Sequence, residues 1–181
     1  MNRKAVADFL TRFEGNIPHM YRCTGGKVTA GVGRAFESAA EACKFSWRIG
    51  NQPAKASDIA GDFLRVSAAE LNHPAGFYKK LTTCTMLPED ISTLLDQDIS
   101  RFEEELKQKL PNWNSYPDEV QRALFDMGYN LGVNGLLGKF PKMLAAVNAH
   151  EWETAAKECQ RQGIGDARNA ATAALFRTAR K

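Results

Sequence analysis

The clearest hydrophobic pattern in the chain begins at Pro88. From there to Leu110, apolar residues recur at helical spacing with acidic residues between them. They are Ile91, Leu94, Leu95, Ile99, Phe102, Leu106 and Leu110. Proline is tolerated at the first position of a helix, and Pro111 cannot continue one. The pattern predicts one long helix over residues 88–110.

Shorter helical patterns follow this segment, separated by glycines and short polar turns. They predict helices over residues 118–131, 141–149, 152–160 and 168–179. The first of these is apolar enough to be the central helix of a helical lobe.

The first 35 residues combine two patterns. Residues 3–13 carry apolar side chains at helical spacing and predict a short amphipathic helix. Gly25 and Gly26 then form a turn signal between two short runs, 19–23 and 27–32. Such a signal predicts a small antiparallel sheet.

Residues 36–85 have the weakest pattern. Residues 38–47 and 57–71 are candidates for helices, and 51–53 and 72–74 are typical of loops. The order of elements predicts an α+β fold, in which a small antiparallel sheet lobe is joined by a long helix to a helical lobe. We expect one domain over residues 1–181. Its parts are a sheet-containing lobe at about 14–87, the interlobe helix at 88–110, and a helical lobe of 111–181 with 1–13.

Composition excludes some classes of protein. Of the 181 residues, 44% are hydrophobic and 25% charged, as in ordinary globular proteins. No apolar stretch is long enough to insert into a membrane. The start, MNRKAVADFL, lacks the apolar run of a signal peptide. We therefore expect synthesis in the cytoplasm and, for a target in the periplasm or cell wall, release or delivery by another system.

The net charge of +3 is uneven along the chain. Residues 1–50 carry eight Lys/Arg against four Asp/Glu, and residues 88–110 carry three against seven. A basic N-terminal part suits an anionic polymer, either cell wall or nucleic acid, and equally an ordinary solvated surface. Basic and aromatic residues do not interleave, so we expect no nucleic-acid partner.

Cysteine spacing argues against a metal site. Cys23, Cys43, Cys84 and Cys159 contain no CxxC pair, and the histidines are scattered. We expect no metal, no cofactor, and free buried thiols with at most one disulfide.

Candidate chemistry lies around the predicted hairpin. Eight residues separate Glu14 from Cys23, and five separate Cys23 from Thr29, which opens the run Thr-Ala-Gly-Val-Gly. A glycosidase needs a carboxylic acid to protonate the leaving oxygen and a second group that handles water or the sugar cation. A free glutamate titrates near ~4.3, so a general acid must be kept protonated by burial or by its neighbours. Taken alone, one glutamate is more often a solvated surface residue.

The spacing resembles that of the T-even phage lysozymes, glycoside hydrolase family 24. Their pattern is Glu, eight residues, Asp or Cys, five residues, Thr, with a T-x-G-x-G run, and it is matched at Glu14, Cys23, Thr29, Gly31 and Gly33. The resemblance implies that Glu14 is the general acid, that Cys23 occupies the position of the water-activating residue, and that Thr29 helps to hold the water.

The C-terminal half resembles the same family. LLDQDISRFEEEL is similar to its interlobe helix, QRALFDMGYNLG to its central helix and RNAATAALFRTA to its closing helix. The resemblance covers about residues 3–35 and 86–179. It implies that Arg168 pairs with Glu14, although 154 positions separate them, and that Asn130 and the adjacent Tyr129 support substrate binding, as does Gly31.

The implied function is hydrolysis of the bond between N-acetylmuramic acid and N-acetylglucosamine in peptidoglycan by a monomeric muramidase. Residues 36–85 are longer than the family's usual segment, and in this the chain resembles pesticin-type bacteriocins and related toxin-domain muramidases. Endolysin and toxin both stay open, and with the toxin an immunity or inhibitor protein as a partner. Cys23 needs its thiolate to act as a base, which Arg22 could favour. A small buried thiol, a non-catalytic glycan-binding module and a hydrolase of chitin-like polymers are the alternatives.

Overall fold

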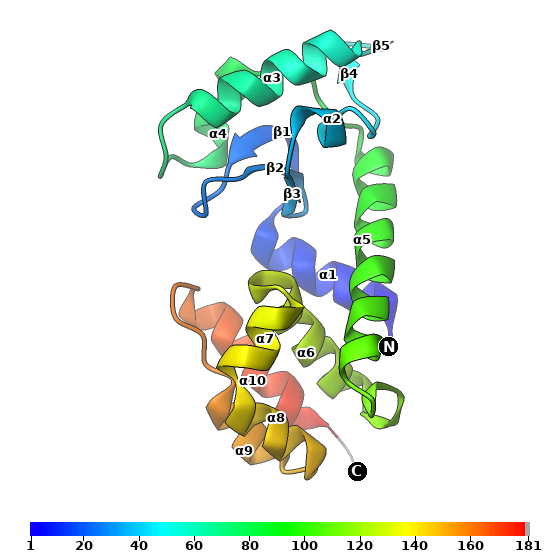
Figure 1. Cartoon of the computed structure of the whole chain (residues 1–181), viewed down its shortest axis with the longest axis vertical. Coiled ribbons are helices and arrows are strands. Elements are labelled where there is room, and N and C mark those ends of the chain that lie inside the picture. Colours follow the sequence, from blue (N-terminus) through cyan, green and yellow to red (C-terminus); the bar gives the residue numbers. More distant parts are fainter. Residues whose placement is uncertain (180–181) are drawn as a thin grey trace. The chain divides into compact units, whose positions relative to one another are not determined.

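The computed structural model describes residues 1–179, which fall into two compact units. Unit 2 comprises Leu10–Asp98, and unit 1 comprises Met1–Phe9 with the chain from Ile99 onward. Both borders lie inside helices, namely α1 (Arg3–Glu14) and α5 (Pro88–Lys109), drawn in Figure 1. The predicted N-terminal helix and the predicted long helix are both confirmed.

The sheet of unit 2 has three antiparallel strands in the order β1-β2-β3. These strands are β1 (Ile17–Arg22), β2 (Val28–Gly31) and β3 (Arg34–Phe36). The predicted hairpin is therefore confirmed. The third strand was not predicted, because three residues are too short to display an alternating pattern.

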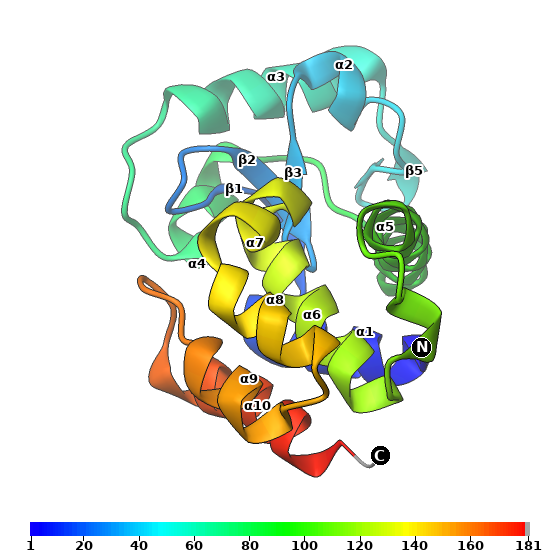
Figure 2. The same cartoon turned by 60° about the horizontal axis from the view of Figure 1, so that its bottom comes forward.

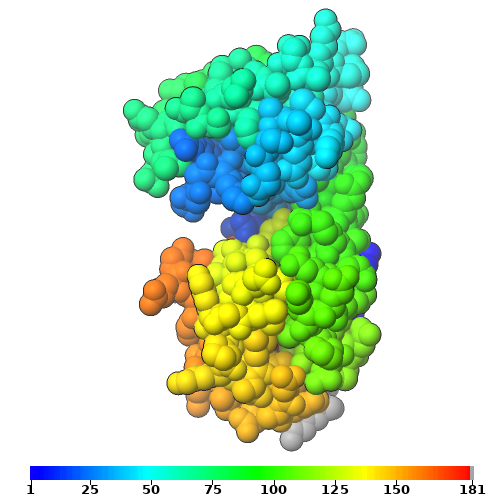
Figure 3. Space-filling view, in the orientation of Figure 1, coloured from blue at the N-terminus to red at the C-terminus, as the bar shows by residue number. Residues whose placement is uncertain are grey.

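Residues 36–85 add a second layer to unit 2. Its elements are α2 (Ala39–Ala42), β4 (Arg48–Ile49), β5 (Gln52–Pro53), α3 (Ala56–Ala68), α4 (Ala75–Tyr78) and the 3-10 turn η1 (Lys79–Leu81). α3 contacts β1 and β2, and α4 contacts β1. In Figure 3 the teal atoms of this segment lie directly above the blue atoms of the hairpin, which are visible on the face shown.

Two expectations for this segment were wrong. The predicted helix over 38–47 ends at Ala42, since the chain then turns so that Phe45 and Trp47 stack against Phe36 of β3. The predicted loop at 51–53 is partly a strand, because β5 pairs with β4. The helix over 57–71 is confirmed as α3, which ends three residues earlier, and the loop at 72–74 is confirmed.

A buried carboxylate fixes the return of this segment. Asp62 of α3 is fully buried and accepts hydrogen bonds from the backbone N–H groups of Thr83 and Cys84, the shortest at 2.9 and 2.7 Å. Arg65, one turn later, also donates to it. Hydrogen bonds to an ionised acceptor are the stronger kind, so Asp62 holds residues 83–84 against α3.

Unit 1 is helical around a buried central helix (Figure 2). Its remaining elements are the 3-10 turn η2 (Trp113–Ser115), α6 (Asp118–Leu131), α7 (Val133–Lys139), α8 (Pro141–Asn148), α9 (Trp152–Glu158) and α10 (Asp166–Thr178). α6 buries eight of the nine residues from Val120 to Gly128, all but Arg122, and packs on α7 and α10. The predicted helices α6, α8, α9 and α10 are confirmed. α7 was not predicted, because its glycines weaken a helical pattern.

The fold is therefore α+β, as the sequence predicted. Across residues 1–179, no helix is both long and apolar enough to cross a membrane.

Candidate active site

Glu14 is the last residue of α1, and its carboxyl group packs against the turn that joins β2 to β3. A Cβ atom placed on Gly33 would lie 3.1 Å from Glu14 Oε2 and 3.2 Å from its carboxyl carbon. Gly33 also has φ +75°, a conformation that costs side-chain-bearing residues free energy. Only glycine thus lets this turn approach the half-buried carboxyl group of Glu14.

Cys23 and Thr29 are tied to one backbone atom. The Cys23 N–H donates to the carbonyl oxygen of Lys27 at 2.9 Å, and the Thr29 hydroxyl donates to the same oxygen at 3.1 Å. Thr29 is buried in β2, whereas the thiol of Cys23 is half-buried just after β1. The hairpin therefore fixes the two residues relative to each other through its own backbone.

Tyr21 is a member of this group that sequence reasoning missed. It lies directly opposite Thr29 in the register of β1 and β2, so both side chains emerge on the same face. Burial, and to a smaller extent the negative charges of Glu14 and Cys23, raise the pKa of Tyr21 to about 12. The phenol therefore stays protonated as a donor near both groups. The sequence signal for Tyr21 was its position two residues before Cys23, because alternate residues of a strand lie on the same face.

Arg22 hydrogen-bonds to backbone groups, and its suggested help to the Cys23 thiolate stays a prediction. Its guanidinium donates to the carbonyl oxygens of Gly26 and Ala69, at 3.1 and 2.5 Å. Neighbouring residues of a strand point to opposite faces, so Arg22 ties the hairpin to the end of α3.

Arg34 anchors the turn that contacts Glu14. Following Gly33, it donates to Asp98 of α5 and, at 2.7 Å, to Glu41 of α2. Burial by itself would raise the pKa of Glu41, but hydrogen bonds from the Glu37 N–H and from Arg34 hold that pKa below its ordinary value. The two carboxylates therefore fix the start of β3.

Gly31 has a packing role. It is buried with φ +62°, and a Cβ atom there would meet Ile91 and Leu94 of α5 at 3.4 and 3.6 Å. The glycine lets β2 lie close against the first turns of α5, and the support for substrate binding expected of Gly31 stays a prediction.

Arg168 lies in a buried polar cluster of unit 1. Its Nε donates to Asp126 Oδ1 at 2.9 Å, and Arg161 and Thr172 donate to Asp126 Oδ2 at 2.6 and 2.8 Å. The sequence associated Arg168 with Glu14, and this pairing stays a prediction. The partner that the structure gives is Asp126, which no motif had indicated. The sequence signal that could have indicated Asp126 was a charged residue among the apolar positions of the predicted central helix.

Tyr129 and Asn130 lie in the last turn of the central helix α6. The ring of Tyr129 packs with those of Phe102 and Phe125, with centroids 5.1 and 6.1 Å away. The amide oxygen of Asn130 is buried and has no hydrogen-bond partner among the described residues. Both support roles stay predictions.

The structure thus brings Glu14, Tyr21, Cys23, Thr29 and Gly33 together within unit 2. They supply a carboxyl group, a protonated phenol, a thiol and a hydroxyl, which is a donor set for acid–base chemistry. All four cysteines are free. Residues 1–179 contain no group of three His, Cys, Asp or Glu side chains able to hold a metal ion.

Comparison with known families assigns the second half of the chain. The model of the phage lysozyme family matches residues 77–177, more than half of the 181 residues. The match contains Asp126, Asn130 and Arg168 but not the hairpin with Glu14, Cys23 and Thr29. No significant match to a curated protein is found.

Proposed function

This chain belongs to the phage lysozyme family, and on that basis we propose that it hydrolyses the bond between N-acetylmuramic acid and N-acetylglucosamine in bacterial peptidoglycan. Family membership supports glycan hydrolysis of the lysozyme kind in general, with peptidoglycan as the substrate. The particular bond and the roles of single residues are our inference.

In the proposed mechanism Glu14 protonates the leaving glycosidic oxygen. The observation that carries this role is the contact between its carboxyl group and the Gly33 turn, which Arg34 anchors from the other side. A general acid must hold its proton at a fixed place beside the bond that breaks, and such packing restricts the carboxyl group to few orientations.

Cys23 takes the role of the group that activates water, and Thr29 helps to hold that water. The Lys27 carbonyl oxygen shared by both residues supports a fixed spacing between the thiol and the hydroxyl. Tyr21 adds a donor that does not ionise in the working range of pH, so it can orient a carboxylate, thiolate or water without competing for the proton.

One observation favours a second function. A thiol is a weaker base than a carboxylate at neutral pH unless it ionises, so Cys23 is compatible with a glycan-binding module that retains the fold without turnover. A hydrolase for chitin-like polymers would use the same groups on a related sugar. The long segment 36–85 supports delivery as an antibacterial toxin over a plain endolysin.

The test is clearing of purified cell walls by the wild type and by Glu14→Gln. We expect the variant to lose roughly 10²–10⁴-fold in rate while it stays folded and still binds walls. Walls cleared at the wild-type rate by Glu14→Gln would remove the proposed acid. A wild type that binds walls without releasing reducing ends would indicate the binding module, and cleavage of chitin oligomers instead would indicate the related polymer.

A further inference from the structure

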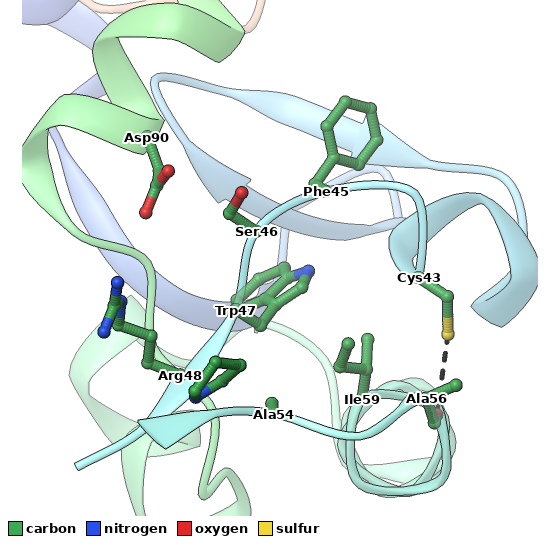
Figure 4. Close-up of a pocket in the computed structure, with 10 residues that line it drawn as sticks. Cys43, Phe45, Ser46, Trp47, Arg48, Ala54, Ala56, Ile59 and Asp90 are labelled. Carbon is green, nitrogen blue, oxygen red and sulfur yellow. Dashed lines mark hydrogen bonds between the residues drawn. The ribbon is translucent and has the colours of Figure 1, made fainter. Parts of the chain in front are cut away.

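The segment 36–85 builds a pocket of about 340 Å³ in unit 2, apart from the proposed acid–base group. Its lining comes from residues 43–56, from Ile59 of α3 and from Asp90 of α5 (Figure 4). Sites for small molecules occupy roughly 300–1,000 Å³, so this pocket suits a ligand of a few residues at most. None of the residues assigned to hydrolysis lines it.

Two opposite charges line this pocket without neutralising each other. Arg48 donates to the backbone oxygen of Asn51 at 3.2 Å and forms no ion pair among residues 1–179. Asp90, in the first turn of α5, likewise forms none in that range. Figure 4 draws both side chains toward one end of the pocket, with Cys43 at the other.

The other side chains of the wall are mostly apolar or already hydrogen-bonded. Trp47 is buried and uses its indole N–H on the Ala42 carbonyl oxygen at 2.9 Å. The Cys43 thiol faces the Ala56 carbonyl oxygen at 3.5 Å. Pro53 and Ile59 add apolar surface. Arg48, Asp90 and the hydroxyl of Ser46 are therefore the groups that can recognise a polar ligand.

A second pocket of about 130 Å³ continues the first. It shares Phe45, Ser46 and Asp90 with it and extends along α5 to Gln97. Two adjoining small pockets accommodate an extended ligand better than a compact ring. Stabilisation of the α5 N-terminus accounts for an acid in the first turn, but not for the guanidinium in the same pocket.

We propose that this pocket binds a short zwitterionic peptide, with a carboxylate of the peptide at Arg48 and an ammonium at Asp90. A guanidinium can bind a carboxylate through two parallel hydrogen bonds. A ligand with a single charge would leave either Arg48 or Asp90 without an oppositely charged partner. The peptides that cross-link the cell-wall glycan are the source that we favour, and this part of the inference rests on the proposed function.

The experiment measures binding of trialanine with free termini by NMR titration to the intact protein. Arg48→Gln and Asp90→Asn should each weaken binding about tenfold, the effect of roughly 1.4 kcal/mol. Lys79→Gln and Glu89→Gln, which remove one charge of each sign outside the pocket, should bind as the wild type does. Trialanine with acetylated and amidated termini should bind at least tenfold more weakly than the free peptide.

Two results with trialanine would overturn the peptide site: no saturable binding, or equal binding of the free and the capped peptide. A third would be binding of N-acetylglucosamine that weakens in Arg48→Gln and Asp90→Asn, which would make the pocket a sugar site. A second measurement compares the rates at which the protein cleaves intact cell walls and glycan strands from which the peptides have been removed.

Arg48→Gln and Asp90→Asn should slow cleavage of intact walls only. An equal effect on both substrates would also count against the peptide site. Peptide binding without hydrolysis of either substrate would instead reject the proposed function and keep the pocket.

Discussion

At the scale of single residues, the site depends on a glycine as much as on its acid. Gly33 meets two demands at once, a left-handed backbone conformation and close approach to the Glu14 carboxyl group. Gly163 has nearly the same φ, +78°, but nothing lies within 4 Å of a Cβ atom there. The two positions therefore separate the cost of the conformation from the cost of the contact.

We expect Gly33→Ala and Gly163→Ala each to destabilise the protein by about 1–2 kcal/mol, the conformational cost of a side chain in this region. Only Gly33→Ala should also lose activity, by about 10²-fold, because the added methyl group displaces the carboxyl group of Glu14. Urea unfolding and wall-clearing assays on both variants measure the two effects. Equal activities would show that the contact with Gly33 does not matter for the reaction.

Cys23 gives a prediction in which pH is the variable. If its thiolate is the base, Cys23→Ala should lose most activity, and Cys23→Asp should keep or raise it. Activity of the wild type should rise with pH as thiols ionise, and this rise should move to the acidic range in Cys23→Asp. Tyr21, with its pKa raised to about 12, adds no ionisation below about pH 11.

An alkylating reagent provides the control for Cys23. In a Cys43→Ala background, which removes the other half-buried thiol, it should inactivate the protein with Cys23 and spare Cys23→Asp. The remaining Cys84 and Cys159 are buried, and burial raises the pKa of each. Full activity in Cys23→Ala would return Cys23 to a structural role.

At the scale of elements, the sequence predicted most where its pattern was long. α5 and α6 have many apolar positions at a regular period, so both were predictable. β3, β4 and β5 have three or two residues each. The contacts around them include the packing of Phe36 against Trp47 and the hydrogen bonds from Arg34 to Glu41 and Asp98. Contacts of that kind depend on partners far along the chain and leave no local signal.

The same reason limits what the sequence tells about the site. The spacing of Glu14, Cys23 and Thr29 could be recognised by resemblance, but Tyr21 required the register of the strands. Asp126 required the packing of α6 against α10.

The ion pairs of Arg34 with Glu41 and Asp98, here called the Arg34 clamp, should make the stability of unit 2 depend on pH in the acidic range. Because the folded protein holds the pKa of Glu41 below the unfolded value of about 4.3, its contribution is present above that value and is lost as pH falls through the lower, folded pKa. Glu41→Gln should therefore lower the melting temperature at pH 7, and the difference from the wild type should shrink between about pH 5 and pH 2. Glu70→Gln, at an exposed carboxyl group, is the control. A difference independent of pH would mean that the charge of Glu41 is not what stabilises the clamp.

At the scale of the whole molecule, the two residues that the resemblance pairs belong to different units. Glu14 belongs to unit 2 and Arg168 to unit 1, and within unit 1 the guanidinium of Arg168 is held by Asp126 in a buried cluster with Arg161 and Thr172. Such a cluster restricts the guanidinium to one orientation, as a group that positions a carboxyl group requires.

The predicted pairing can be measured as a coupling free energy. Arg168→Ala should destabilise the protein by at most about 3–5 kcal/mol, since Asp126 keeps Arg161, and it should lower activity. A double-mutant cycle with Glu14→Gln, read out by urea unfolding, should give an interaction of about 0.5–3 kcal/mol. Strictly additive effects would mean that the two side chains do not meet.

The interrupted order of the units has a consequence for synthesis on the ribosome. Residues 1–9 belong to the same unit as the chain from Ile99 onward, and the whole of unit 2 is translated between them. At about 5–20 residues per second, that delay lasts roughly 5–20 seconds. Arg3, at the start of α1, is translated before unit 2. Glu103, with which it forms an ion pair, is translated only after unit 2. Unit 2 can therefore acquire its structure while the nascent chain is still growing. Unit 1 can form only after its second segment has been made, well after residues 1–9 have left the exit tunnel.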